Sequence, residues 1–295
     1  MYEQIASNKR KSFFLILFFV ALIFLLAWTF EYLTGLGEGG LIFAIIFAGA
    51  SAIGSYYASD KIVLAISKAR PATKEEFPHL YNVVEGLAIA AGIPPPKCYV
   101  IEDTALNAFA TGRNPQHAVI CVTTGLVQTM NRVELEGVVA HEMSHIKNFD
   151  IRLQTLAVVM VGVIALLSDW ILRSFLWGGK GRRSGKDKGA GAILIVVGLV
   201  MAALGPIAAQ LLRLSLSRKR EFLADASGAL ITRYPPGLAS ALRKIAADNE
   251  PLEAANKATA HLYISNPLKN LKGPMNRLFS THPPIEERIA ALEKM

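Results

Sequence analysis

Two histidines and a glutamate within five residues of the chain could form a hydrolytic metal site. Residues 138–150 read VVAHEMSHIKNFD and contain His141, Glu142 and His145. In a helix, residues four apart lie on one face with Cβ atoms about 5–6 Å apart, so the two imidazoles can bind one ion together. Zinc accepts histidine nitrogens at about 2.0–2.1 Å. Glu142 projects beside the pair and can reach a metal-bound water, which is the H-E-x-x-H pattern of a zinc hydrolase.

A catalytic zinc ion needs a third protein ligand, with the fourth position left to water. The best candidate is Glu221, in the segment RKREFLADA at 218–226. Glu221 and Asp225 share a helix face at i,i+4, so Glu221 can bind the metal while Asp225 accepts a proton from a ligating histidine ring and fixes its tautomer. Three further histidines have no partner at ligand spacing and are interpreted as surface or core residues: His79, His117 and His261.

With three ligands in place, zinc lowers the pKa of its bound water toward about 7. Glu142 can then take the proton as the water attacks a peptide carbonyl, and hand it to the leaving amine. The metal and a nearby donor would stabilise the oxyanion. Two residues near the predicted C-terminal helix are candidate donors: His282 and Arg288.

A short segment between two β-like runs, 97–101 and 117–123, is a candidate for substrate contact. Extended backbone beside the metal helix could accept a peptide substrate as an added strand. We hypothesise this role for four consecutive residues: Asn107, Ala108, Phe109 and Ala110. The alternative is an ordinary turn and strand. The three segments together predict a small antiparallel sheet.

The composition indicates that part of the chain lies in lipid. Of the 295 residues, 52% are hydrophobic, and the mean hydropathy is +0.36, which is too apolar for a soluble enzyme. The net charge of +8 does not indicate a nucleic-acid partner, because the basic residues flank apolar segments without interleaved aromatics. The two cysteines, Cys98 and Cys121, lack CxxC spacing and are predicted to be reduced thiols packed on neighbouring strands.

The N-terminal region predicts a transmembrane hairpin. Residues 12–30 form an uninterrupted apolar run, long enough to cross a hydrocarbon core of about 30 Å, and a second run covers 41–59. No small-residue cleavage site follows the first run, which favours an anchor over a removable signal peptide. Basic residues precede the first run and follow the second, so the N-terminus and everything after Lys61 are predicted to be cytoplasmic. The predicted location is the cell (inner or plasma) membrane, with the active site facing the cytoplasm.

A second hydrophobic hairpin is predicted at 155–177 and 190–212, joined by the basic loop 178–189. If both segments cross, the loop lies on the non-cytoplasmic side, against the positive-inside tendency. Asp169 and Arg173 also lie inside the first segment, where they must pair or face a cavity. Two interpretations stay open: a spanning hairpin, which we favour, and a re-entrant pair packed against the first two helices.

The expected fold is mainly α-helical, a multi-pass membrane protein whose zincin-like metalloprotease domain contains the small antiparallel sheet. Helices are predicted over 75–91 and from Arg132 through the H-E-x-x-H motif. The chain is expected to have four consecutive parts: an N-terminal transmembrane hairpin, 1–60; a first protease segment with the metal helix, 61–154; the second hydrophobic hairpin, 155–212; and a second protease segment with the third zinc ligand, 213–295.

These motifs, in this order, resemble the HtpX group of the M48 zinc metalloproteases. The similarity covers nearly the whole chain and includes NAFATG at 107–112, HEMSH at 141–145, SRKREFLADA at 217–226 and THPP at 281–284. The resemblance implies one catalytic zinc ion held by His141, His145 and Glu221, with Glu142 as general base. It also implies cleavage of misfolded or damaged membrane proteins at the cytoplasmic face, and overlap in quality control with a membrane-bound ATP-dependent protease.

Two alternatives differ in substrate or in class. A dedicated processing enzyme of the prenyl-protein type would be favoured by seven or more spans and a large chamber, whereas the sequence has four hydrophobic segments. A non-catalytic membrane scaffold or chaperone would use the metal structurally. Structural zinc sites are usually closed by a fourth protein ligand, and no cysteine or histidine is spaced to provide one.

Overall fold

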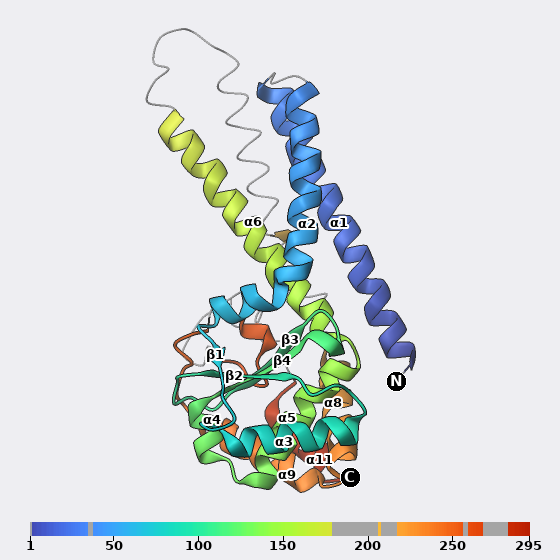
Figure 1. The fold of residues 1–295 in the computed structure, drawn as a ribbon, viewed down its shortest axis with the longest axis vertical. Helices are drawn as coiled ribbons and strands as arrows, with labels where there is room; N and C mark the ends of the chain where they lie inside the picture. The colour runs from blue at the N-terminus through green and yellow to red at the C-terminus, as the bar shows by residue number, and fades with distance from the viewer. Residues whose placement is uncertain (1, 35–37, 179–205, 208–216, 256–258, 268–282) are drawn as a thin grey trace.

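The computed structural model describes residues 2–34, 38–178, 206–207, 217–255, 259–267 and 283–295. Three long helices, α1 (Tyr2–Thr34), α2 (Glu38–Ile66) and α6 (Asp150–Gly178), project from a globular part that holds the sheet and the other helices (Figure 1). The remaining elements are β1 (Arg70–Pro71), α3 (Pro78–Ala91), β2 (Lys97–Ile101), β3 (Ala108–Gly112), η1 (Pro115–His117), β4 (Ala118–Thr123), α4 (Thr124–Thr129), α5 (Arg132–Lys147), α8 (Arg218–Thr232), α9 (Pro235–Ala247), η2 (Ala260–Leu262) and α11 (Ile285–Leu292).

The sheet is mixed, so the predicted antiparallel sheet is wrong. Its strand order is β1-β2-β4-β3, with β2 parallel to β4 and the other two neighbouring pairs antiparallel. The chain leaves β2, forms β3, and then returns to place β4 between them. Residue patterns at a period of two predict extended backbone but not strand direction, because both directions have the same side-chain period. All residues of β3 and β4 are buried, so these strands also lack a solvent-facing side.

The two cysteines lie where the sequence predicted. Cys98 on β2 and Cys121 on β4 are buried free thiols. They sit on paired strands, and Cys121 is opposite Tyr99. They are packed sulfhydryl groups of the core.

Helix α3 begins three residues later than predicted, because Pro78 occupies its first turn. The residue before a proline is disfavoured in the α region, and Phe77 accordingly has ψ 59°. The helix ends where expected, at Gly92, whose φ of 68° lies in the left-handed region.

Helix α5 is the centre of the globular part. Asn131 and Glu134 form a reciprocal capping box at its start. Every residue from Gly137 to Ile146 is buried, between the sheet, α3, α8 and α9 (Figure 1). At Gly228 of α8, an added Cβ would lie 3.0 Å from the backbone nitrogen of His141. The backbones of α8 and α5 therefore approach closely at the H-E-x-x-H motif.

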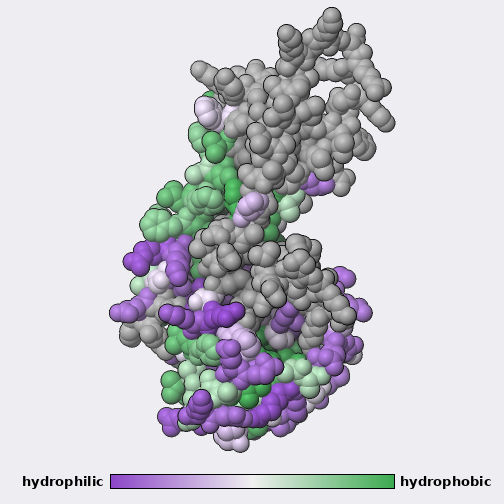
Figure 2. All heavy atoms as spheres, turned by 180° about the vertical axis from the view of Figure 1, so that it is seen from behind, coloured by the Kyte–Doolittle hydropathy of each residue, from purple (hydrophilic) through white to green (hydrophobic). Residues whose placement is uncertain are grey.

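The projecting helices pack along one another by apolar side chains. Leu15 and Phe19 of α1 join a buried cluster with Leu153 and Leu156 of α6. Other large apolar side chains on α1 and α2 remain exposed: Phe13, Phe14, Leu17, Phe18, Phe24, Leu25, Trp28, Ile42, Ile46, Ile53 and Tyr57. Figure 2 shows this apolar surface above the polar surface of the globular part.

Among the described residues, no single helix is both long and apolar enough to cross a membrane. Helix α5 and the first part of α6 (Arg132–Lys147 and Asp150–Ala165), which meet at 81°, are long and apolar enough only when taken as a pair. The predicted segment 155–177 is helical as part of α6. Apart from residues 206–207, the segment 190–212 lies outside the described residues, as does the basic loop beyond Gly178.

Candidate metal centre

Helices α5 and α8 bring three candidate ligands together in the interior. His141 and His145 come from α5 and Glu221 from the first turn of α8. One potential ligand atom from each lies within 4.8 Å of the others, and all three residues are buried. The Nε2 atoms of the two imidazoles are 3.2 Å apart. Each Nε2 lies 3.7 Å from a carboxylate oxygen of Glu221.

The other ring nitrogen of each imidazole, Nδ1, lies close to a buried aspartate. His141 Nδ1 lies 2.8 Å from Asp225 Oδ1, and His145 Nδ1 lies 3.0 Å from Asp150 Oδ2. A carboxylate can only accept, so each Nδ1 carries a proton and donates it. In the neutral imidazoles both Nε2 lone pairs therefore point at one place beside the Glu221 carboxylate. Two histidine nitrogens and one carboxylate, each histidine oriented by an outer carboxylate, fit the donor set of a catalytic zinc ion.

The electrostatics of the cluster also favour a cation. Burial alone lowers the pKa of His145, but the Glu221 charge and the hydrogen bond to Asp150 outweigh burial and raise this pKa to about 9. Positive charge between these carboxylates is therefore stabilised, which is the condition a divalent ion requires in a buried site.

Glu142 lies beside the ligand cluster without belonging to it. It is buried, and its Oε1 has no hydrogen-bond partner among the described residues. Burial raises the pKa of the Glu142 carboxyl, and the neighbouring imidazoles oppose this shift. A carboxylate whose pKa is raised is a stronger base and is better suited to accept a proton from water.

Arg288 of α11 holds Asp225. Its Nε and Nη2 donate to the two oxygens of Asp225 at 2.8 and 2.7 Å, and its Nη1 donates to Ile264 O at 2.9 Å. Burial alone would raise the pKa of Asp225, but the Arg288 charge and the hydrogen bonds from Arg288 and His141 hold it well below its ordinary value. The guanidinium lies on the Nδ1 side of His141, at 3.4 Å.

The sequence indicates Arg288 as a candidate oxyanion donor, whereas in the structure its guanidinium holds the carboxylate of Asp225. Three of its N–H groups donate to Asp225 and to Ile264 O, and the guanidinium lies on the Nδ1 side of His141, opposite the Nε2 atom that faces the ligand cluster. The other candidate donor, His282, lies outside the described residues.

Sequence reasoning missed Asp150. The residue follows the second histidine by five positions and opens α6. Its carboxylate lies beside His145 because the chain turns between α5 and α6 at Phe149, whose φ is 60°. A left-handed φ is uncommon for phenylalanine, so no residue pattern signalled this turn. The only available signal was an aspartate closely following the motif.

Residues 74–295 match Peptidase family M48. The chain belongs to peptidase family M48. It is 51% identical over 294 residues to "Protease HtpX homolog" of Dictyoglomus turgidum, covering 100% of this chain and 94% of that protein. It is 44% identical over 300 residues to "Protease HtpX homolog" of Streptococcus gordonii, covering 100% of both. The site and these relatives identify an M48 metalloprotease of the HtpX type.

The fold of this M48 chain resembles that of a solved structure. The match to "Crystal Structure of S. mikatae Ste24p" has a TM-score of 0.50 at 20% sequence identity. It covers 99% of this chain and 67% of that chain. At this identity the likeness concerns the fold alone.

In the M48 chain, three residues of the segment proposed to contact substrate, Ala108 to Ala110, lie in the edge strand β3, which packs against α5, and Asn107 directly precedes the strand. Asn107 O accepts a hydrogen bond from Thr123 N of β4, so the backbone groups of Ala108 and Ala110 face the outer edge. Ala108 O accepts from Ile264 N at 2.9 Å. Among the described residues, the outward backbone groups of Ala110 have no partner. Phe109 is buried against Tyr263, with ring centroids 5.0 Å apart.

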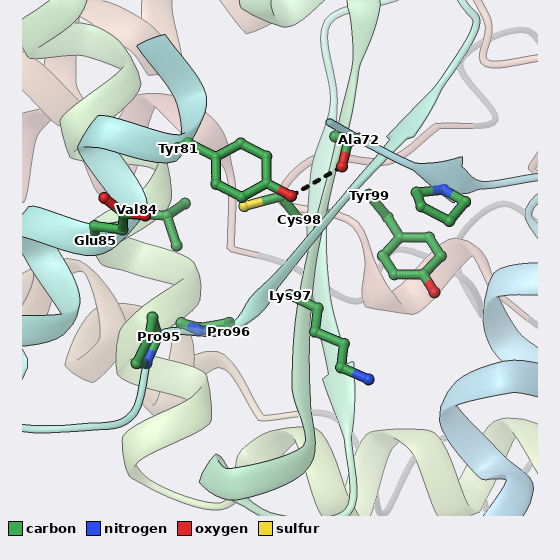
Figure 3. A pocket seen from close by; sticks show the side chains of 10 residues that line it. Ala72, Tyr81, Val84, Glu85, Pro95, Pro96, Lys97, Cys98 and Tyr99 are labelled. Atoms are coloured by element: carbon green, nitrogen blue, oxygen red, sulfur yellow. Dashed lines mark hydrogen bonds between the residues drawn. The ribbon is translucent and has the colours of Figure 1, made fainter. Parts of the chain in front are cut away.

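A separate cavity of about 360 Å³ lies between α3 and strands β1 and β2 (Figure 3). Tyr81 and Cys98 line it, and Tyr81 Oη donates a 2.8 Å hydrogen bond to Ala72 O. Burial raises the pKa of the Cys98 thiol to about 12, so Cys98 is not a thiolate nucleophile at neutral pH.

Proposed function

We propose that this protein is an integral-membrane, zinc-dependent endopeptidase that hydrolyses peptide bonds in misfolded or damaged membrane proteins. The observation that carries the catalytic part is the convergence of His141, His145 and Glu221 within 4.8 Å. Each histidine is backed by a buried aspartate, and a buried glutamate lies next to the ligands. This arrangement supplies the metal ligands, their orientation and a base in one place.

Each residue has a defined task in peptide hydrolysis. When bound, zinc supplies a Lewis acid that polarises the scissile carbonyl and acidifies a water. Glu142 takes the proton of the attacking water and passes it to the leaving amine. Asp225 and Asp150 keep the histidine Nδ1 atoms protonated and the Nε2 atoms free to bind metal.

The substrate is proposed to bind as an extended strand along β3. The outward backbone N–H and C=O of Ala110 supply one pair of strand hydrogen bonds, while Ala108 O is already used by Ile264 N. Main-chain recognition of this kind does not depend on side-chain identity, which suits an enzyme that acts on many unfolded segments.

Membrane insertion through α1, α2 and α6 is supported by the surface of the projecting helices. Phe13, Leu17 and Leu25 of α1 are each more than half exposed, and so are Ile46 and Ile53 of α2. Contiguous apolar surface of this kind is characteristic of a membrane-embedded region (Figure 2). The basic residues that flank the helices favour a cytoplasmic globular part, where the enzyme would overlap in quality control with a membrane-bound ATP-dependent protease.

Cleavage of unfolded casein tests the proposed activity. The purified protein in detergent should lose activity when a chelator removes its metal, and zinc should restore it, because the ligand set requires a divalent ion. Fragment formation on gels measures the activity. Absence of cleavage under zinc-replete conditions would contradict the proposal.

Protease digestion of sealed inverted membrane vesicles tests the orientation. The globular part should be digested from outside these vesicles, because their outer face is the cytoplasmic face. Protection of the globular part until detergent is added would place it on the other side.

A further inference from the structure

The N-terminal helix reaches the metal centre through one buried side chain. Asn8 of α1 has no exposed surface. Its amide nitrogen lies 2.6 Å from Asp150 Oδ1 and 2.9 Å from the carbonyl oxygen of Asn148. Both partners are acceptors, so the amide nitrogen of Asn8 must face them. The side-chain oxygen of Asn8, Oδ1, has no hydrogen-bond partner among the described residues. The side chain therefore contacts its neighbours through the NH₂ group alone.

Asp150 connects this amide to a metal ligand. One carboxylate oxygen accepts from Asn8 and the other faces His145 Nδ1 at 3.0 Å. Arg220 Nε lies 3.6 Å from the first oxygen, and Asp150 itself is buried. A carboxylate held at both oxygens has little freedom to rotate, so the orientation and tautomer of His145 depend on what holds Asp150.

The two histidine ligands are thus supported in parallel ways. His141 is oriented by Asp225, which is held by Arg288 of α11. His145 is oriented by Asp150, which is held by Asn8 of α1. In the second case Asn8 and Asp150 are 142 positions apart in the sequence. Asn8 belongs to α1, whose other features are those of a membrane anchor.

Further contacts fix α1 at the junction between α5 and α6. Asn148 ends α5, Phe149 adopts φ 60°, and Asp150 begins α6. Asn8 bridges Asn148 and Asp150 across this turn, and Lys9 Nζ lies 4.4 Å from the centre of the Phe149 ring. Of these two side chains, Asn8 contacts Asp150 itself whereas Lys9 contacts only Phe149, so Asn8 is the residue that links the packing of α1 on α6 to the geometry of the Asp150 carboxylate.

We propose that Asn8 is a positioning residue for the metal site, acting through Asp150 on His145, so that α1 is part of the metal centre. This inference rests on the metal site of the proposed function. It predicts that changing Asn8 alters metal binding itself, and not only the docking of α1.

Metal affinity of the full chain in detergent tests this inference. Asn8→Leu has nearly the same size but cannot donate, so zinc should bind about 10–100-fold more weakly in a chelator competition, as for other outer partners of metal ligands. The visible spectrum of the cobalt-substituted protein should also change. Asn8→Ser, which keeps one hydroxyl donor, should recover part of the affinity and provides a test if the leucine variant does not fold.

Two variants of the same helix serve as controls. Ser12→Ala alters a fully buried residue one turn further along α1, and Lys9→Ala removes the contact with Phe149. Both should keep the wild-type zinc affinity and cobalt spectrum. If Asn8→Leu matches Ser12→Ala in both readouts, the inference is overturned, even if its thermal stability falls, because Asn8 would then only dock the helix. If the wild type itself binds no zinc, the proposed function fails instead.

Discussion

Glu142→Gln should reduce kcat/KM for casein by about 10²–10⁴-fold while leaving the zinc content unchanged. Glutamine preserves the shape of the side chain but cannot take a proton from water. Glu142 is buried beside His141 and His145 and is not one of the converging ligands, so the metal should remain. Initial cleavage rates and metal analysis of the same preparations measure the two effects.

A matched control lies on the same helix. Glu136 forms an i,i+4 ion pair with Arg132 at the protein surface, which is worth about 0.3–0.5 kcal/mol. Glu136→Gln should therefore keep both activity and zinc. Equal cleavage by Glu142→Gln and Glu136→Gln would remove Glu142 from the mechanism, and loss of zinc from Glu142→Gln would make it a ligand.

Arg288→Met should destabilise the protein by about 3–5 kcal/mol, because it leaves the buried carboxylate of Asp225 without its charged partner. The variant loses a two-pronged contact of 2.7 and 2.8 Å and the bond to Ile264 O. Asp225 also orients His141, so zinc should bind more weakly as well. Thermal unfolding in detergent and chelator competition measure the two consequences.

Arg243→Met is the corresponding control between α9 and α11. Arg243 pairs with Glu293, and about half of each side chain is exposed, so its loss should cost less than about 1 kcal/mol. Equal stability of the Arg288 and Arg243 variants would show that the buried pair does not hold the site together.

Local spacing was sufficient to predict that His141 and His145 lie together on one face of α5, since four residues make about one helical turn whatever surrounds the helix. Glu221 was predictable as the third candidate ligand because Asp225 follows it at the same spacing, and the structure brings Glu221 close to the two histidines. The helix itself, from Arg132 through the motif, agrees with the structure. These features depend only on the period of the helix.

Features that depend on how elements meet were not predictable from these patterns. The direction of β2 relative to β4 depends on where β4 is inserted, not on the residues of either strand. The role of Arg288 depends on α11 docking beside α8. Asp150 lies beside His145 because of the turn at Phe149, and Asn8 lies beside Asp150 because α1 packs along α6. The outer supports of the metal site therefore had to come from the three-dimensional structure.

The zinc content of Glu221→Gln tests most directly whether two distant parts of the chain form one catalytic metal site. The wild type is expected to retain one zinc ion per chain after dialysis against a weak chelator. Glu221→Gln should lose it and should not cleave casein, because the third ligand then lacks its charge. Glu136→Gln, treated in the same way, should retain both zinc and activity. If Glu221→Gln keeps its zinc with wild-type affinity, Glu221 is not a ligand and the proposed metal centre is incorrect.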